Sequence, residues 1–102
     1  MKIGSTVANA LSGVSSAAKT RNVASHNVAN FLTEDFRPLR SHQIERRGGG
    51  SEVLTERAER PEPVDLAAEF VRSDVASIQA KASLRLIDAE LELTGELVDI
   101  LA

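Results

Sequence analysis

Small and apolar residues recur through the first third of the chain at intervals of three and four, and this rhythm limits what the chain can fold into. The positions are Val7, Ala10, Val14, Ala17, Ala24, Val28 and Phe31. A repeat close to 3.5 residues places them along one side of a long α-helix, which we expect to run from about residue 5 to residue 31. Because most of these side chains are small, the stripe favours close approach of another backbone over an ordinary globular core.

Gly13 lies inside this expected helix. A glycine in a helix interior costs roughly 1 kcal/mol relative to alanine. A close contact with another element, or with another chain, would offset that loss. The alternative is an accidental glycine in a loosely specified helix.

The composition leaves little material for a globular core. The chain has 102 residues, three Phe and no Cys, Trp or Tyr, so we expect one domain at most and no disulfide framework. No run of eighteen apolar residues exists, which predicts that the chain does not span a membrane. Gly4, Ser5 and Asn9 interrupt the N-terminal stretch, so we expect it to be retained rather than cleaved as a signal peptide.

Charge is distributed unevenly along the chain. Residues 1–32 contain three basic residues and no acid, for a net charge of +3. Residues 33–63 carry a net charge of −1 and residues 64–102 a net charge of −5. A basic first helix and an acidic last helix should attract each other, within one molecule or between molecules. The alternative is that the acidic face serves only solubility.

The middle of the chain predicts a minimal connection between two helices. Thr33 to Asp35 turn the chain, and Pro38 breaks any helix. Residues 36–60 hold two polar segments around Gly48 to Gly50, which predict a weak β-hairpin or an extended loop with a flexible tip. Pro61 and Pro63 then precede a final helix. We therefore divide the chain into residues 1–35, a linker of residues 36–63 and residues 64–102.

The usual signatures of chemistry are missing from the sequence. The Arg46-Arg47 pair is offset by nearby glutamates, and no Tyr or Trp is present for base stacking, which argues against nucleic-acid binding. His26 and His42 are the only histidines and do not have the spacing of a metal site. No Gly-x-Ser-x-Gly pattern occurs. We expect no enzymatic activity, no metal and no cofactor.

The final helix has more apolar surface than one partner helix can cover. Three stripes are visible: Val71, Val75, Ile78 and Ala82; Ala80, Leu84, Ile87, Leu91, Val98 and Leu101; and Leu86, Leu93, Leu97 and Ile100. A helix of about 38 residues would be roughly 55 Å long, and its apolar sides call for several neighbours. Because the chain offers only one other long helix, we expect other subunits to cover the remainder.

Three segments in the first helix and the turn after it resemble the N-terminal signature of the bacterial flagellar axial proteins, which include the basal-body rod and hook proteins. The segments are Ala10 to Gly13 (ALSG), Asn27 to Asn30 (NVAN) and Thr33 to Phe36 (TEDF), against ALSG, NNIAN and N-T-x-G-Y in the family. His26 replaces an Asn and Asp35 replaces the turn Gly. Asp tolerates a left-handed backbone better than most residues, so we expect the turn to form.

The turn motif has a physical interpretation. Asn27 and Asn30 lie three residues apart on one helix face, where their amides can bond backbone groups freed in the last turn. We expect Asn27, Asn30, Thr33 and Phe36 to shape the turn.

The last helix also resembles the family. Val64 to Val71, VDLAAEFV, is similar to the family's V-D-L-A-E-E-x-V opening. Ala76, Ala82 and Ile87 match the subsequent Ala, Ala and Ile, whereas Ser77 and Ile78 replace a Gln-Arg pair. Together the two likenesses cover residues 10–36 and 64–101.

The resemblance implies a mainly α-helical fold, in which two long terminal helices form a coiled-coil-like hairpin joined by a short extended or β-hairpin-like segment. It implies a structural subunit of the flagellar basal-body rod in the periplasm, exported by the flagellar type III apparatus without a cleaved leader. Its partners would be copies of itself, other axial subunits and the export apparatus. The expected subunit contacts are Leu11, Gly13, Val14, Val28, Leu84, Ile87, Leu91 and Val98.

Two other functions fit the same sequence. One is a cytosolic adaptor or chaperone that copies the axial-protein ends and binds their helices. The other is a helical hairpin unrelated to flagella that dimerises into a four-helix bundle.

Overall fold

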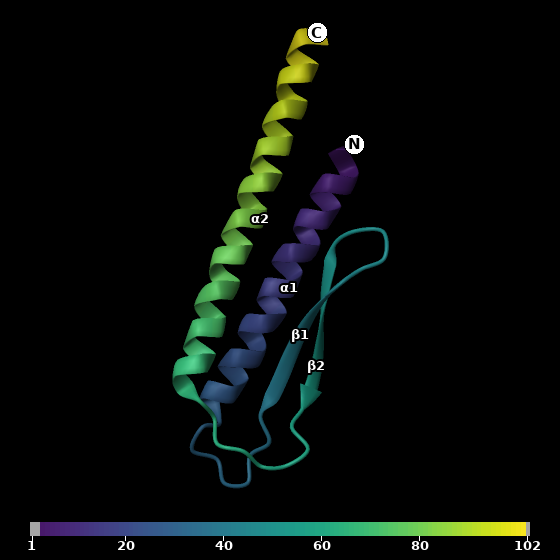
Figure 1. Ribbon diagram of the computed structural model, residues 1–102. Helices are drawn as coiled ribbons and strands as arrows, with labels where there is room; N and C mark the ends of the chain where they lie inside the picture. Colours follow the sequence, from purple (N-terminus) through teal and green to yellow (C-terminus); the bar gives the residue numbers. More distant parts are fainter. Residues whose placement is uncertain (1–2, 102) are drawn as a thin grey trace.

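Two long antiparallel helices, with a β-hairpin lying along the first of them, make up the fold (Figure 1). The computed structural model describes residues 3–101; residues 1, 2 and 102 lie outside the described part. The elements are α1 (Ile3–Ala29), β1 (Leu39–Glu45), β2 (Ser51–Arg57) and α2 (Leu66–Leu101). The predicted fold class, a helical hairpin with a short β-hairpin in its middle, is confirmed. The molecule measures 64 × 25 × 13 Å, so it is elongated and thin.

The α1–α2 seam is built from small side chains. Ala10, Ala17 and Ala24 of α1 are buried, as their spacing predicts. The α2 residues that face α1 are buried or half-buried and follow a 3.5-residue repeat. They are Glu69, Ser73, Ala76, Ala80, Ser83, Ile87, Glu90 and Thr94. Gly13 lies directly against Ser83, because a Cβ at Gly13 would be 2.6 Å from the Ser83 hydroxyl oxygen.

α1 ends earlier than the sequence indicates. The last helical residue is Ala29, and Phe31 lies beyond the helix with 46 % of its surface exposed, so its expected place in the apolar stripe is wrong. The cause is Asn30, whose Nδ2 donates a hydrogen bond to the His26 carbonyl oxygen at 2.9 Å and so satisfies a carbonyl left free by the helix end. Asp35 adopts a positive φ of 54°, so the turn forms with Asp in place of Gly.

The β-hairpin lies on a second face of α1. Its strands pair antiparallel from Leu39 opposite Arg57 to Glu45 opposite Ser51. Gly48, Gly49 and Gly50 at the tip all have positive φ, a conformation that side chains disfavour. Gly49 and Gly50 rest on Asn9 and Ser12 of α1 so closely that a Cβ at either position would lie under 3 Å from those side chains.

Hydroxyl groups fasten this hairpin to α1. The Ser51 amide donates to Ser12 Oγ at 3.0 Å, and the hydroxyls of Ser16 and Ser51 lie 3.0 Å apart. Val53 is the one residue of β1 and β2 that is buried, with 7 % of its surface exposed. The contact is therefore narrow and mostly polar.

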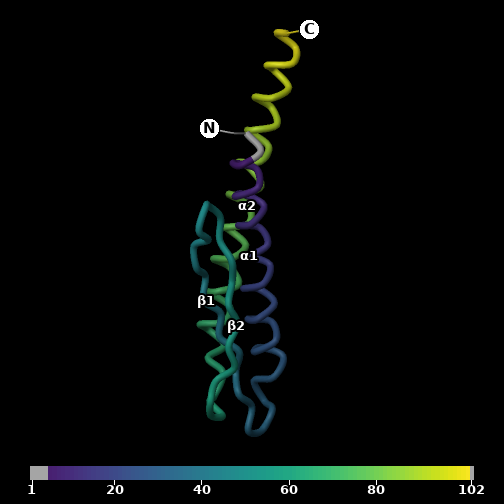
Figure 2. The backbone as a smooth tube through the Cα atoms, turned by 90° about the vertical axis from the view of Figure 1, so that its right-hand side faces the viewer, coloured from purple at the N-terminus to yellow at the C-terminus, as the bar shows by residue number. Residues whose placement is uncertain are grey.

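The start and end of α2 differ in their surroundings. Asp65 caps the start, with its Oδ1 accepting a hydrogen bond from the Ala68 amide at 3.1 Å. At the other end α2 continues past α1 (Figure 2). Since Gly13 faces Ser83, Ile3 lies level with about residue 93 of α2. The last two turns of α2 therefore have no helical neighbour in the described chain.

Enlarging a side chain in the seam should destabilise the hairpin. Ala17 is fully buried, whereas the adjacent Ala18 is exposed. Ala17→Leu is expected to lower the free energy of unfolding by about 1–3 kcal/mol, because the seam has no room for the added atoms. The matched variant Ala18→Leu should leave it nearly unchanged. Urea unfolding followed by circular dichroism measures both, and equal stabilities would contradict the close packing at Ala17.

Candidate assembly surfaces

Asn27 joins the end of α1 to the start of β1. Its Nδ2 donates to the Leu39 carbonyl oxygen at 2.8 Å, and its Oδ1 accepts from the Leu39 amide at 2.8 Å. The side-chain amide thus pairs with Leu39 as a neighbouring strand would. Asn27 is 1 % exposed, so it satisfies backbone groups at the strand edge without opening the site to water.

The four predicted turn residues lie around the end of α1, and each makes a different contact. Asn30 bonds the last turn of α1 as expected, and Thr33 donates to Asn30 Oδ1 at 3.1 Å. The Phe36 ring packs on the His26 ring with centroids 5.6 Å apart. Asn27 differs from the expectation, because its amide bonds β1 rather than the helix end. Such a long-range partner leaves no local signal in the sequence.

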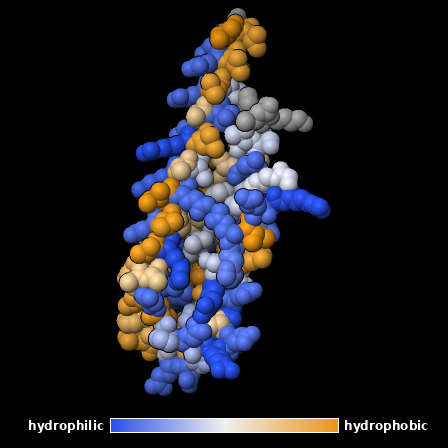
Figure 3. All heavy atoms as spheres, in the orientation of Figure 1, coloured by the Kyte–Doolittle hydropathy of each residue, from blue (hydrophilic) through white to orange (hydrophobic). Residues whose placement is uncertain are grey.

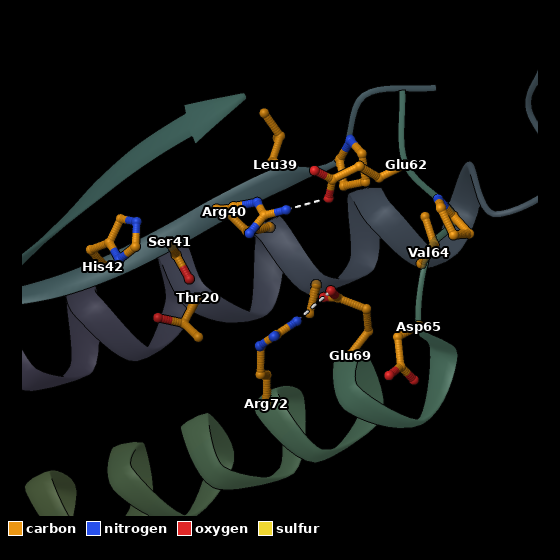
Figure 4. A pocket seen from close by; sticks show the side chains of 14 residues that line it. Thr20, Leu39, Arg40, Ser41, His42, Glu62, Val64, Asp65, Glu69 and Arg72 are labelled. Atoms are coloured by element: carbon orange, nitrogen blue, oxygen red, sulfur yellow. Dashed lines mark hydrogen bonds and ion pairs between the residues drawn. The ribbon is translucent and has the colours of Figure 1, made fainter. Parts of the chain in front are cut away.

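A groove runs between β1 and the start of α2, with α1 as its floor (Figure 4). Its volume is about 270 Å³. Arg40 reaches across from β1 to form an ion pair with Glu62, and Arg72 of α2 donates to Glu69 Oε1 at 2.6 Å. Two pairs of opposite charges that line the groove are thus bound to each other.

Glu69 is the unusual residue of this groove. It is only 5 % exposed, and its Oε2 has no hydrogen-bond partner in the described part of the chain. It occupies a seam position where Ala or Ser stands in the following turns. A buried carboxylate oxygen without a partner weakens the packing at this end of the hairpin.

The eight predicted subunit contacts fall into two groups. Gly13, Val14, Val28 and Ile87 are half-buried, and Gly13 and Val28 lie between α1 and α2 of the same chain. Leu11, Leu84, Leu91 and Val98 are exposed, between 51 % and 58 % of their surface. The second group remains available to other molecules.

The structure shows a long exposed apolar surface on α2 that the sequence predictions do not treat as one surface. It comprises nine apolar residues, here called the outer stripe: Val71, Val75, Ile78, Ala82, Leu86, Ala89, Leu93, Leu97 and Ile100. Their spacing of four, three and four residues repeats every eleven, which keeps them on one side of a straight helix. The seven larger members are between 46 % and 79 % exposed. Figure 3 shows apolar side chains along the whole length of α2.

The eleven-residue period joins residues that the sequence predictions place in two separate stripes. From the sequence, these residues are predicted to form two separate stripes, one that ends at Ala82 and one that begins at Leu86, and Ala89 belongs to neither. The structure shows that both groups are exposed. An eleven-residue repeat places both groups on the same side of the helix.

No ion pair joins α1 to α2 in the described residues. The ion pairs found in residues 3–101 join Arg40 to Glu62, Arg46 to Glu52 and Arg72 to Glu69. Lys19 and Arg21 of α1 are both exposed and form no ion pair with α2. These two basic side chains of α1 therefore lie on the surface without an ion-pair partner on α2 in the described residues.

No known protein-family model matches this chain, and no curated protein is similar to it. No helix within residues 3–101 combines the length and apolarity needed to cross a membrane. In the same residues, no three histidine or carboxylate side chains are grouped so that they could hold a metal ion.

Removing the Asn27 amide should loosen the hairpin at its base. Asn27→Ala deletes two hydrogen bonds at a buried position, so we expect the free energy of unfolding to fall by about 2–3 kcal/mol. Amide hydrogen exchange at Leu39 should accelerate. Asn22→Ala, at an exposed position of the same helix, is the control and should change neither. Unaltered exchange at Leu39 in Asn27→Ala would contradict the pairing.

Replacing the buried carboxylate should not harm the fold. Glu69→Met keeps a similar volume and removes the unpartnered oxygen, so the free energy of unfolding is expected to stay equal or rise. Arg72→Met leaves the carboxylate buried without its donor and should lower it by about 1–3 kcal/mol. Thermal unfolding of both variants checks the opposite signs, and a loss of stability in Glu69→Met would show that the carboxylate is well accommodated.

Proposed function

We propose that this chain is a structural, non-catalytic subunit of the bacterial flagellar basal-body rod, which polymerises through its terminal helices. One observation carries the proposal. α2 uses a stripe of mostly small side chains to pack on α1, while its outer stripe and Leu84, Leu91 and Val98 remain exposed. A helix with apolar surface on several sides is expected to have several neighbours, and residues 3–101 provide one, α1.

The resemblance to axial proteins supports the same function. It rests on residues 10–36 and 64–101, which correspond to the two helices and the turn after α1. Asn30 ends α1 and Asp35 takes the left-handed conformation, so the turn tolerates the departure from the family's glycine. The proposed subunit would lie in the periplasmic rod after export by the flagellar type III apparatus.

Charge favours contacts between different helices of neighbouring subunits. α1 carries Lys19 and Arg21 on its surface without ion-pair partners on α2, and residues 64–102 have a net charge of −5. An α1 surface that meets the α2 surface of the next subunit brings opposite charges together. Such a contact joins two different patches, so it extends into an open helical polymer when the rotation between subunits does not close a ring.

Cell fractionation separates this function from its two rivals. A rod subunit copurifies with basal bodies. A cytosolic adaptor for axial proteins stays in the soluble fraction of cells with assembled flagella. An unrelated dimerising hairpin leaves swimming unaffected when its gene is deleted.

Acidic substitutions at the exposed end of α2 test the proposed contacts. Leu91→Asp combined with Val98→Asp places two charges on a surface that assembly would bury, so incorporation into basal bodies should be lost. Both side chains are more than half exposed in the isolated chain, so its fold should survive, as circular dichroism would show.

Leu54→Asp is the matched control. Leu54 is 49 % exposed but lies on the outer face of the β-hairpin, away from both helices. This variant is expected to be incorporated normally. Normal incorporation of the Leu91/Val98 variant would show that these two residues are not subunit contacts.

A further inference from the structure

We propose that the groove between β1 and the start of α2 binds an extended peptide segment of a partner protein, which pairs with the outer edge of β1 and places an arginine side chain against Glu69. The inference concerns the isolated chain and does not depend on the proposed rod function. It rests on a buried carboxylate oxygen without a donor, on the edge of β1 that lies away from β2, and on the size of the groove between them.

Glu69 presents an acceptor inside the groove. Its Oε1 accepts a hydrogen bond from Arg72 at 2.6 Å, whereas its Oε2 is buried and has no partner among the described residues. Buried polar atoms are normally bonded, so this oxygen marks a place where a ligand can supply a donor. The side chain of Arg72 is 57 % exposed and makes this one hydrogen bond within residues 3–101, so it can turn outward and admit the ligand.

The charges that line the groove favour a cation. Three carboxylates face two guanidinium groups, so with His42 neutral one negative charge is in excess. These residues are Glu62, Asp65, Glu69, Arg40 and Arg72. A guanidinium group suits a buried carboxylate better than an ammonium group does, because it is weakly hydrated and presents several donors in one plane.

The hydrogen bonds at the two ends of the β-hairpin define the edge of β1. The Ala58 amide donates to the Pro38 carbonyl oxygen at 2.8 Å, and the Arg46 amide donates to the Gly50 carbonyl oxygen at 2.9 Å. In an antiparallel pair, residues that exchange bonds alternate with residues whose backbone groups point outward. Counted between these two bonds, Ser41 directs its N–H and C=O away from β2.

The outer edge of β1 already binds one strand-like partner. Leu39 lies on it two residues before Ser41, and the Asn27 amide takes up both backbone groups of Leu39. Ser41 lines the groove, and no side chain of the described residues caps its backbone groups as Asn27 caps those of Leu39. An added strand can therefore continue the pairing from the point where Asn27 stops.

The size of the groove fits one side chain of such a strand. Its volume of about 270 Å³ is below the roughly 300–1,000 Å³ of sites that enclose a drug-sized ligand. Ser41 lies on one wall and Glu69 on the other (Figure 4). Because alternate side chains of a strand point to opposite faces, a segment paired at Ser41 directs one side chain inward, toward Glu69. An arginine at that position makes both contacts at once.

Titration with a short peptide tests the site. The probe is the pentapeptide Thr-Val-Arg-Val-Thr with blocked ends, and amide chemical shifts of the isotope-labelled full chain report its binding. We expect saturable shifts at Ser41, Glu69 and Arg72. A peptide with citrulline, which has a similar shape without the charge, should bind at least about tenfold more weakly. Agmatine, a free guanidinium compound without a peptide backbone, should also bind more weakly.

Two variants each remove one contact. Glu69→Gln replaces the carboxylate with a neutral amide and should weaken binding of the arginine peptide at least about tenfold. Ser41→Pro removes an N–H that points away from β2, so the hairpin should form while binding weakens about fivefold. The matched controls are Glu90→Gln, at a half-buried seam position outside the groove, and Thr55→Pro, on the opposite edge of the hairpin. Both controls should bind with full affinity.

Circular dichroism verifies the fold of every variant, and the Glu69→Gln result decides alone if Ser41→Pro loses the hairpin. The proposal is overturned by an absence of saturable shifts, by equal binding of the citrulline peptide, or by unchanged affinity in Glu69→Gln or in a folded Ser41→Pro. Agmatine that binds as tightly as the arginine peptide would overturn the peptide as the occupant. Incorporation into basal bodies is a separate measurement, so either result can fail without the other.

Discussion

Close contact between α1 and α2 is the interaction on which the rest of the structure depends. It is made mainly by alanine, serine and glycine residues, and Gly13 lies against Ser83 with no space for a Cβ. Small side chains bring the helix axes near each other but bury little apolar area each. The seam therefore fixes the geometry of the hairpin while using Ile87 but few of the other large apolar residues of α2. Those residues, Leu and Ile in particular, remain on the surface.

A thin core explains the importance of polar anchors. The β-hairpin contributes one buried strand residue, Val53, and is otherwise held by Ser12, Ser16 and the amide of Asn27. In a larger protein such bonds would supplement an apolar core. Here they set the register of β1 on α1, because Asn27 pairs with one particular residue of the strand. The turn after α1 brings Phe36 and Pro38 to positions from which the strand can begin.

Periodicity and turn chemistry made most of the fold predictable. Ala10, Ala17 and Ala24 repeat at seven-residue intervals, as expected of a helix in contact with another element, and Gly48 to Gly50 mark the turn between two polar segments. The exact end of α1 was less predictable, because Phe31 continues the apolar pattern after Asn30 has already capped the helix. The partner of Asn27 and the burial of Glu69 depend on contacts between distant segments, which a local pattern does not contain. The sequence predicts that α2 has more apolar surface than one helix can cover. It did not reveal the eleven-residue period of the outer stripe.

Two periods coexist on α2, and they favour opposite supercoils. The side that faces α1 repeats every 3.5 residues and favours a left-handed twist, whereas the outer stripe repeats every eleven and favours a right-handed one. If α2 is packed on both sides, the left-handed and right-handed tendencies oppose each other, and the helix stays straight over its length of about 54 Å. Such a rod of fixed length can set the distance between whatever binds at its two ends, in the manner of a spacer.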